Sequence, residues 1–439
     1  MIQRLRDIDA IQDVQKNPYE NRRRAAYLGR LVAKRQGDQA NLIHNLGIEF
    51  LRAGDSVRAL RAFKALREGL AKGGVKTTPE QRAELRFYEI TAWLRLAEQQ
   101  NCLGHHGRES CLMPIRGSGV HVDRKASSEA IRLIEKELSY FPDDLADRWL
   151  LNLAWMTLGG WPDKVPERFR IAPEVFASKA PMPRLLDVGG EAGVNALGLS
   201  GGAVAEDFDG DGLIDIMCSS WHLKDQIRLF RNKGDGTFED VTTAAGLEGL
   251  TGGLNLVHAD YDNDGDFDVL VLRGAWRGPS GHWPNSLLRN DGKGRFTDVT
   301  EAAGLLSFHP SPTAAFADFD RDGDLDLFIG NESRGKDTHD SEFFRNEGDG
   351  TFKDITHEVG LEINRWVKAV SWGDIDNDGD PDLYETLGGA FFGDRYTNAL
   401  FLNPGSGNRQ ITLRFEGTKS NRCALGARFT VRITMDDGT

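Results

Sequence analysis

The stretch DFDGDGLID, at residues 207–215, returns in three further versions along the chain. They read DYDNDGDFD at 260–268, DFDRDGDLD at 318–326 and DIDNDGDPD at 374–382. All four fit the pattern D-x-D-x-D-G-x-x-D, and successive copies begin 53, 58 and 56 residues apart. One copy is unremarkable in an acidic protein, but four copies at a nearly constant interval predict a repeat architecture.

Each copy places carboxylates at positions 1, 3, 5 and 9 of a tight loop, where they can converge on one hard cation. The glycine at position 6 permits the sharp turn, and the carbonyl of position 7 can add another oxygen. A ligand set of oxygens without nitrogen or sulfur is typical of calcium. The sequence therefore predicts about four Ca²⁺ sites, with the ligands Asp207, Asp209, Asp211 and Asp215; Asp260, Asp262, Asp264 and Asp268; Asp318, Asp320, Asp322 and Asp326; and Asp374, Asp376, Asp378 and Asp382.

A second element keeps the same period. LFRNKGDGTFEDVT (229–242), LLRNDGKGRFTDVT (287–300) and FFRNEGDGTFKDIT (343–356) follow the first three loops and have the strand–turn–strand signature of hairpins. Short apolar strands also flank each acidic loop. Four short strands in each unit of about 56 residues indicate a propeller blade. An EF-hand would place amphipathic helices beside the loop instead.

These residues resemble the FG-GAP/VCBS repeats of calcium-binding propellers, as in integrin α-chain heads. The resemblance covers about 184–405 and implies that each acidic loop lies in a hairpin of one blade and binds structural calcium. RLLDVGGEAGV (184–194) is similar to the tail of a repeat. We therefore expect a strand at 184–188 that supplies the missing outer strand of the last blade and closes the ring.

The end of the sequence shows a second resemblance. TLRFEGTKSNRCALGARFTVRI (412–433) is similar to the start of the ASPIC/UnbV domain of cartilage acidic protein-like proteins, through the core from Gly417 to Arg428. That domain normally continues through more strands. We therefore expect residues 406–439 to be a partial β domain, truncated or completed by a partner.

The first 180 residues are expected to be helical. Apolar residues recur at a spacing of three to four through 41–70 and 81–99. The stretch 45–63 fits the tetratricopeptide pattern through Leu46, Gly47, Phe50, Ala59 and Phe63, and 130–159 fits it more weakly. The predicted fold is thus α+β and multidomain: a TPR-like helical domain at 1–180, a β-propeller at 184–405 and a partial β domain at 406–439.

The segment NCLGHHGRESCLMPIRGSGVH (101–121) interrupts the helices. Sulfur and imidazole ligands gathered in a loop suggest a transition metal such as copper, iron or zinc. The candidate ligands are Cys102, His105, His106, Cys111 and His121. The spacing is not that of a standard zinc finger, so a Cys102–Cys111 disulfide and a loop with neither feature both stay open.

The sheet region adds five histidines at or near connections between predicted strands: His222, His258, His282, His309 and His339. Each is more often a surface or core residue than a ligand. Because propeller loops converge on one face, we expect some of them to face the helical domain.

The net charge and the composition indicate which classes of partner and which compartments suit the protein. The net charge of −13 divides into +7 for residues 1–180 and −20 for the rest, so the two parts are expected to dock on each other. Such an acidic propeller is a poor nucleic-acid binder. No apolar run is long enough to span a membrane. The first residues do not form a signal peptide. The expected compartment is therefore periplasmic or extracellular if such a peptide was removed, and otherwise cytoplasmic.

Two functional hypotheses follow. The first is a calcium-rigidified binding or scaffold module that holds a protein, peptide, glycan or small molecule at the interface between helices and propeller. The second is a metal-dependent oxidative enzyme whose Cys/His loop holds the transition metal. The resemblance gives the second some weight, because ASPIC/UnbV proteins with a helical N-terminal part include members encoded with natural-product pathways, such as enediyne assembly. The sequence contains no established catalytic motif, so whether the protein is an enzyme stays open.

Overall fold

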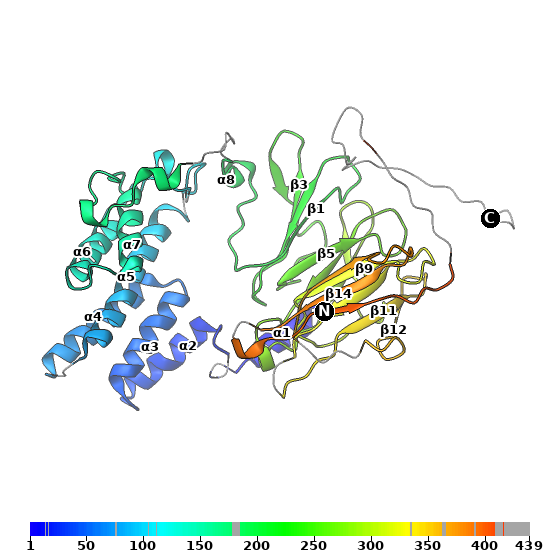
Figure 1. The fold of residues 1–439 in the computed structure, drawn as a ribbon, viewed down its shortest axis with the longest axis horizontal. Coiled ribbons are helices and arrows are strands. Elements are labelled where there is room, and N and C mark those ends of the chain that lie inside the picture. The colour runs from blue at the N-terminus through cyan, green and yellow to red at the C-terminus, as the bar shows by residue number, and fades with distance from the viewer. Residues whose placement is uncertain are drawn as a thin grey trace.

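The computed structural model describes residues 1–408 and Glu416, except 14, 16, 75–76, 104, 111, 178–184, 334–335, 362–365 and 390–391. A helical N-terminal region is followed by several antiparallel sheets (Figure 1), so the mixed α and β composition is confirmed. Gly417 to Arg428, the core of the expected C-terminal domain, lies outside the described residues.

The helical region is built from consecutive helices that pack on one another. Its helices are α1 (Ile2–Ala10), α2 (Asn21–Ala33), α3 (Gln39–Arg52), α4 (Ser56–Lys72), α5 (Pro79–Asn101), α6 (Lys125–Tyr140) and α7 (Leu145–Thr157). Each helix from α2 to α7 contacts the next one, which gives the stacked array at the left of Figure 1. The short helices η1 (Gly117–Gly119), η2 (Glu167–Phe169) and η3 (Pro173–Phe176) lie between and after them.

Local sequence explains where these helices begin. Asp38, Asp55 and Asp144 each accept a hydrogen bond from a backbone N–H in the first turn, and Thr78 forms a capping box with Gln81. The helix pair predicted within 45–63 is α3 and α4, and the two helices lie close together. Phe63 is fully buried, and a Cβ atom added at Gly47 would lie 2.4 Å from the Phe63 ring. A glycine at this position therefore lets the two helices approach closely.

The described residues form four sheets after the helices, each ordered as its strands occur in the chain. The first contains β1 (Ala203–Glu206), β2 (Asp215–Cys218), β3 (Arg228–Asn232) and β4 (Phe238–Asp240). The second contains β5 (Asn255–Ala259), β6 (Asp268–Leu272), β7 (Ser286–Asn290) and β8 (Phe296–Asp298). The third contains β9 (Thr313–Ala317), β10 (Asp326–Gly330), β11 (Glu342–Asn346) and β12 (Phe352–Asp354). The fourth contains β13 (Val367–Gly373), β14 (Asp382–Leu387) and β15 (Ala399–Phe401). The predicted strand pairs around each acidic loop and the three predicted hairpins are confirmed.

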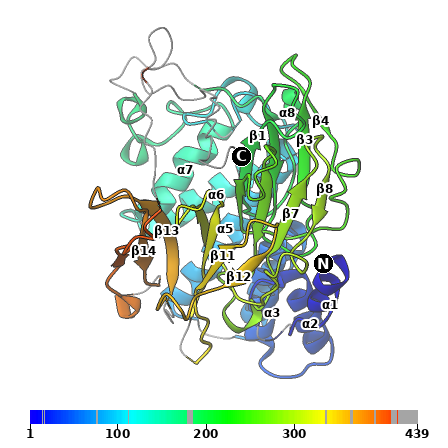
Figure 2. The ribbon, with the colours of Figure 1, turned by 90° about the vertical axis from the view of Figure 1, so that its right-hand side faces the viewer.

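Successive sheets pack side by side through their first strands (Figure 2). β1 contacts β5, β5 contacts β9, and β9 contacts β13. A separate apolar cluster fills each space between neighbouring sheets, with Phe208 and Met217 between the first two, Tyr261 and Leu327 between the next two, and Phe343 and Leu383 between the last two. Alternating apolar residues along short strands produce these layers.

The strand expected at 184–188 is not formed by its described residues, and that prediction was wrong. Residues 185–188 have no strand pairing, and the short helix α8 (Gly189–Ala192) follows directly. Asp187 accepts the Gly189 N–H, and its own N–H bonds the carbonyl of Arg108. These bonds tie the segment to the helical region rather than to a sheet.

The antiparallel order gives every sheet two distinct ends. The acidic loops connect the first and second strands at one end. The connections between the second and third strands, and the links to the next sheet, lie at the other end. Helix α1 packs at this second end, where Leu5 contacts Leu223 and Trp283. We call this second end the docking end.

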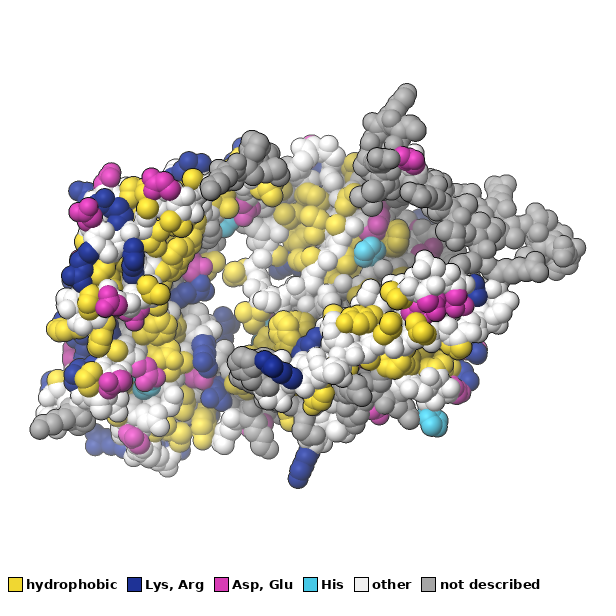
Figure 3. All heavy atoms as spheres, in the orientation of Figure 1, with side chains coloured by type: hydrophobic (Ala, Val, Ile, Leu, Met, Phe, Trp, Pro, Cys, Tyr) yellow, Lys and Arg dark blue, Asp and Glu magenta, His cyan; other side chains and the backbone are white. Residues whose placement is uncertain are grey.

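The helical region therefore docks on the sheets at the docking end, as expected from the charges, and it also contacts α8. Arg4 and Asp9 of α1 pair with Glu301 and Lys224 at the docking end. Arg108 pairs with Glu191 of α8. Figure 3 shows an opening between the helices and the sheets, with background visible through it. Among the described residues, no helix is long and apolar enough to cross a membrane.

Candidate metal centres

The backbone of each acidic loop follows directly from its sequence. Position 6 is glycine, with φ of 88°, 93°, 101° and 99° at Gly212, Gly265, Gly323 and Gly379. Residues other than glycine rarely adopt this backbone conformation. The N–H of that glycine donates to the carboxylate of position 1, over 2.9 Å at Asp207 and 3.1 Å at Asp260. The first carboxylate is thus turned inward over the loop.

The aspartate at position 9 fixes the loop to the sheet. Asp268 is buried, and its two carboxylate oxygens accept from the N–H groups of Tyr261 (3.3 Å) and Asn290 (2.8 Å). The same two bonds recur at Asp215, Asp326 and Asp382. Burial raises the pKa of Asp268 to about 8 and that of Asp326 to about 7. Without a cation nearby, these carboxylates are therefore costly to ionise.

Within each loop, three carboxylates bring one oxygen each within 4.8 Å of the others. They come from positions 1, 3 and 9 in the second, third and fourth loops, and from positions 1, 3 and 5 in the first. The position 5 aspartates of all four loops also accept the N–H two residues on, as Asp264 does from Asp266 over 3.0 Å. Position 5 therefore braces the turn in each loop.

The second and third loops offer oxygen donors of the kind that calcium binds. One carboxylate oxygen of each of Asp260, Asp262, Asp318 and Asp320 is shielded from solvent and accepts no hydrogen bond. Burial raises the pKa of all four carboxyl groups, and neighbouring aspartates raise it further. Converging buried carboxylate oxygens without donors are costly unless a cation compensates them, so the residues fit a Ca²⁺ ion.

Comparisons with known proteins agree with this geometry. The family model described as "FG-GAP-like repeat" matches residues 207–271, 275–329 and 318–385, and each match begins at or contains an acidic loop. The chain therefore contains FG-GAP-like repeats and is similar in sequence to cartilage acidic protein 1. Human cartilage acidic protein 1 is 29% identical over 241 residues, which are 54% of this chain and 34% of that protein. The protein of the same name from Xenopus tropicalis is 32% identical over 150 residues, 34% of this chain and 22% of its own length. The matched part thus spans about a third or less of these relatives.

The Cys/His loop of this FG-GAP chain brings only part of the candidate set together. Cys102 and His121 are buried, with Sγ and Nε2 3.5 Å apart. His121 Nδ1 contacts the Ser127 hydroxyl over 3.1 Å, and burial lowers the pKa of the imidazole. His106 turns away to Asp187, 2.7 Å distant, and His105 is exposed. Cys111, and with it the disulfide alternative, lies outside the described residues.

The five histidines of the sheet region separate into three environments. His222 lies at the docking end and pairs with Glu20 of the helical region over 3.3 Å, as expected for part of the set. His258 lies beside Glu206 and Phe267. His282, His309 and His339 converge on one another, and Asp337 joins them. Sequence reasoning did not single out Asp337, because the residues that it meets are up to 55 positions away in the chain.

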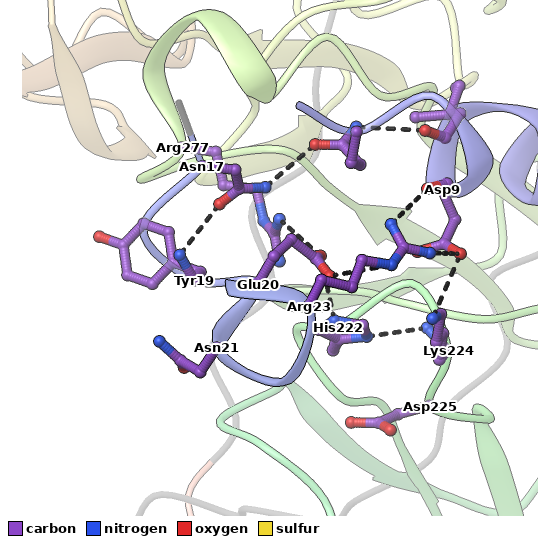
Figure 4. Close-up of polar contacts among 12 residues, drawn as sticks. Asp9, Asn17, Tyr19, Glu20, Asn21, Arg23, His222, Lys224, Asp225 and Arg277 are labelled. Carbon is purple, nitrogen blue, oxygen red and sulfur yellow. Dashed lines mark hydrogen bonds and ion pairs between the residues drawn. The ribbon is translucent and has the colours of Figure 1, made fainter. Parts of the chain in front are cut away.

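Glu20 is the centre of the junction between the helical region and the sheets (Figure 4). Its carboxylate lies 3.3 Å from His222, 3.7 Å from Arg23 and 3.9 Å from Arg277. The His222 hydrogen bond is the main reason that the pKa of Glu20 lies below its ordinary value. The helical region is basic overall and the sheet region acidic, but in this pair the charges are the other way round. The acid, Glu20, comes from the helical region, and the base, Arg277, comes from the sheet region.

Arg277 is the buried cation of this junction. Its side chain has no exposed surface, and its guanidinium carbon lies 4.1 Å from the ring centres of both Trp221 and Trp283. Tyr19 of the helical region packs edge-on against Trp221, at 4.6 Å between ring centres. Burial lowers the pKa of Arg277 to about 10, which still leaves it charged at neutral pH. The junction is thus held by cation–π and aromatic contacts as well as by the ion pair.

Proposed function

We propose that this protein is a calcium-stabilised binding or scaffold module in which FG-GAP blades form a propeller and a TPR-like helical array docks on it. The observation that carries the proposal is the inward-facing set of carboxylates in each acidic loop. In two loops it includes four buried oxygens without donors, at Asp260, Asp262, Asp318 and Asp320. Calcium would supply the missing positive charge and would bind the folded chain more tightly than the unfolded one.

The role of calcium in this proposal is structural. Positions 1 and 3 of each loop hold the ion, while the position 9 aspartate ties the loop to the hairpin of its own repeat. An ion that neutralises the loop fixes the distance between the strands on either side. No acid–base pair or nucleophile is required of these aspartates, so they support binding rather than catalysis.

Two surfaces of the protein are suited to a ligand. The first is the opening between the helices and the sheets (Figure 3). The helical region contacts the rest of the chain at the Glu20 junction and at the Arg108–Glu191 pair. The second is a groove of about 560 Å³ between α3, α4 and α5. Apolar side chains such as Leu66 and Leu85 line it together with Arg67, Arg82 and Glu84. A mixed lining of this kind suits an extended peptide segment, with apolar contacts for affinity and charges for register.

Elemental analysis tests the calcium part of the proposal. Tag-free protein dialysed against calcium without chelator is expected to retain about four Ca²⁺ per chain, and its melting temperature is expected to fall when a chelator is added. Unchanged melting after complete removal of calcium would contradict a structural role.

A peptide and glycan selection tests the binding part. The full chain is presented in calcium and, separately, after calcium removal. Ligands that bind only the calcium-loaded chain are then tested on Arg82→Glu, which changes the helical groove, and on Arg108→Glu, which changes the rim of the opening. Loss of binding in one variant alone assigns the surface. A chain that selects no ligand in either state would contradict the binding role.

A further inference from the structure

A group of side chains at the docking end has the chemistry of a second kind of metal site. His282 lies in the connection between β6 and β7, His309 in the link from β8 to β9, and Asp337 and His339 in the connection between β10 and β11. We call these four residues the histidine cluster. The chain topology brings them together from the second and third sheets, at the end opposite the acidic loops.

Three members of the cluster present ligand atoms to a common point. Asp337 Oδ1 lies 3.0 Å from His282 Nε2 and 3.3 Å from His339 Nε2, and one ligand atom from each residue lies within 4.8 Å of the other two. A tetrahedral ion with bonds of about 2.1 Å separates its ligand atoms by about 3.4 Å. The spacing thus matches an ion of that size after small side-chain adjustments.

The fourth member holds one ligand in place. His309 Nδ1 lies 2.8 Å from His339 Nδ1, so the nitrogen of His339 that faces away from Asp337 already has a partner. Metal-binding histidines typically have their second nitrogen fixed in this way. The backbone on either side of His339 is fixed as well, because its N–H donates to the Ser333 hydroxyl over 2.6 Å and its carbonyl accepts from the same hydroxyl over 2.7 Å.

The cluster also offers an ion a shielded ligand atom and a path from solvent. His339 Nε2 is shielded from solvent and makes no hydrogen bond of good geometry, although Asp337 lies 3.3 Å away. About half of the His282 side chain is exposed (47%), so an ion has a path from solvent.

We propose that His282, Asp337 and His339 form a binding site for a divalent transition metal such as zinc, with His309 as a positioning residue. Two imidazole nitrogens and one carboxylate oxygen are a ligand set for zinc and its neighbours rather than for calcium, which prefers oxygen alone. Three protein ligands leave at least one coordination position open toward solvent. The site is separate from the acidic loops and from the Cys102–His121 pair.

The site also lies close to the junction with the helical region. Trp283, the residue after His282, contacts Leu5 of α1 and stacks on Arg277. An ion bound by His282 would therefore fix the loop on which the helical region rests. This places the proposed metal between two sheets and beside the docked helix, where it can stabilise both contacts.

Zinc titration of the full chain tests the proposal. Transition metals are removed with phenanthroline, which leaves calcium in place, and Zn²⁺ is added in millimolar calcium while heat is recorded. We expect one equivalent to bind, and His282→Gln and Asp337→Asn each to weaken binding at least tenfold. The side chain of His282 is about half exposed and that of Asp337 is 18% exposed. Both variants keep side chains of similar shape, so their calcium-dependent melting is expected to match the parent and to exclude misfolding.

Two control variants separate the cluster from the rival loop at 101–121. Cys102→Ser and His105→Gln are expected to leave zinc binding unchanged. Co²⁺ provides a second readout, because nitrogen and oxygen ligation gives visible d–d bands without the near-ultraviolet band of a cobalt–thiolate bond. Loss of the site in Cys102→Ser, a thiolate band, or unchanged binding in both His282→Gln and Asp337→Asn would each overturn the proposal.

Discussion

The side-chain amide of Asn290 donates a 2.9 Å hydrogen bond to the backbone carbonyl of Phe208, which lies inside the acidic loop of the preceding repeat. Asn346 bonds the Tyr261 carbonyl in the same way over 2.7 Å, and Asn403 bonds that of Phe319 over 2.8 Å. Each of these asparagines also donates its backbone N–H to the position 9 aspartate of its own loop. One residue thus links the loops of two successive repeats.

This link predicts that Asn346→Ala destabilises the protein and weakens calcium binding. Asn346 is buried, and its removal leaves the carbonyls of Tyr261 and Leu325 without a donor. An unsatisfied buried polar group costs about 1–3 kcal/mol, so we expect the free energy of unfolding to fall by about 2 kcal/mol or more. Urea unfolding in calcium measures this change.

Asn232→Ala is the matched control. Asn232 has the same place in the first sheet and the same bond to its position 9 aspartate, but its side chain donates only to Ile214 of its own repeat and is only partly buried. Its loss is expected to cost less than half as much. Equal costs for the two variants would show that the link between repeats carries no special stability.

Substitution of a position 3 aspartate in one acidic loop is predicted to remove one calcium ion. Asp262→Asn and Asp320→Asn each remove the charge of a position 3 carboxylate that has a buried oxygen without a donor, so each variant is expected to bind about one Ca²⁺ less than the parent. Asp349→Asn is the control, because Asp349 lies in a hairpin turn and its carboxylate accepts from Thr351. Elemental analysis decides. If all three variants retain the same calcium content, the assignment of position 3 as a ligand is wrong.

Burial of Glu342 predicts a pH dependence of stability. Burial raises the pKa of this carboxyl from 4.5 to about 7, although Asn331 and Ser307 donate to it. The folded protein therefore holds a proton that the unfolded chain releases, and stability falls as the pH rises from about 4.5 through about 7. His309, 3.8 Å away, contributes no compensating charge, because its own pKa is lowered.

Glu342→Gln tests this dependence, since glutamine keeps the shape and still accepts both hydrogen bonds. At pH 5 the variant and the parent are expected to melt alike. At pH 8 the variant is expected to be more stable, by about 3 kcal/mol at most from 1.36 kcal/mol per pKa unit. Thermal melts of zinc-free protein at several pH values measure the difference. A parent protein whose advantage over the variant grows with pH would reverse the expected sign and refute the argument.

The sequence predicted those features that depend on neighbours in the chain. The acidic loops, their flanking strands and the hairpins at 229–242, 287–300 and 343–356 follow from local patterns of glycine, aspartate and alternating apolar residues, and the structure has each of them. The strand expected at 184–188 was wrong because it was inferred from the likeness of 184–194 to the tail of a repeat. Asp187 instead bonds to the helical region, which a local pattern cannot reveal.

Contacts between distant segments were harder to predict. The five histidines of the sheet region were named as individual residues. The sequence did not predict that His282, His309 and His339 contact one another, or that Asp337 lies beside them. That meeting depends on how the second and third sheets pack. Likewise, the net charges predicted that the two parts dock through basic residues of the helical region and acidic residues of the sheets. At the main junction the acid, Glu20, lies in the helical region and the base, Arg277, in the sheet region. Net charge describes a whole region, whereas a junction depends on a few buried groups.

That junction gives the last prediction. Glu20→Ala removes the carboxylate that compensates Arg277, whose guanidinium is fully buried between Trp221 and Trp283. Breaking a buried ion pair by removing one partner is strongly destabilising, and we expect a loss of roughly 3 kcal/mol in the free energy of unfolding. Because the segment before α2 is held by the same contacts, we also expect proteases to cut residues 11–20 faster.

Arg4→Ala is the control, since Arg4 and Glu301 form an exposed pair in the same junction and such pairs contribute about 0–1 kcal/mol. The pKa of Glu20 is lowered in the folded protein, so its contribution is present above pH 4.5 and is lost as the pH falls through the lowered value. A Glu20→Ala variant as stable and as protease-resistant as Arg4→Ala would mean that the aromatic contacts of Arg277 hold the junction without the ion pair.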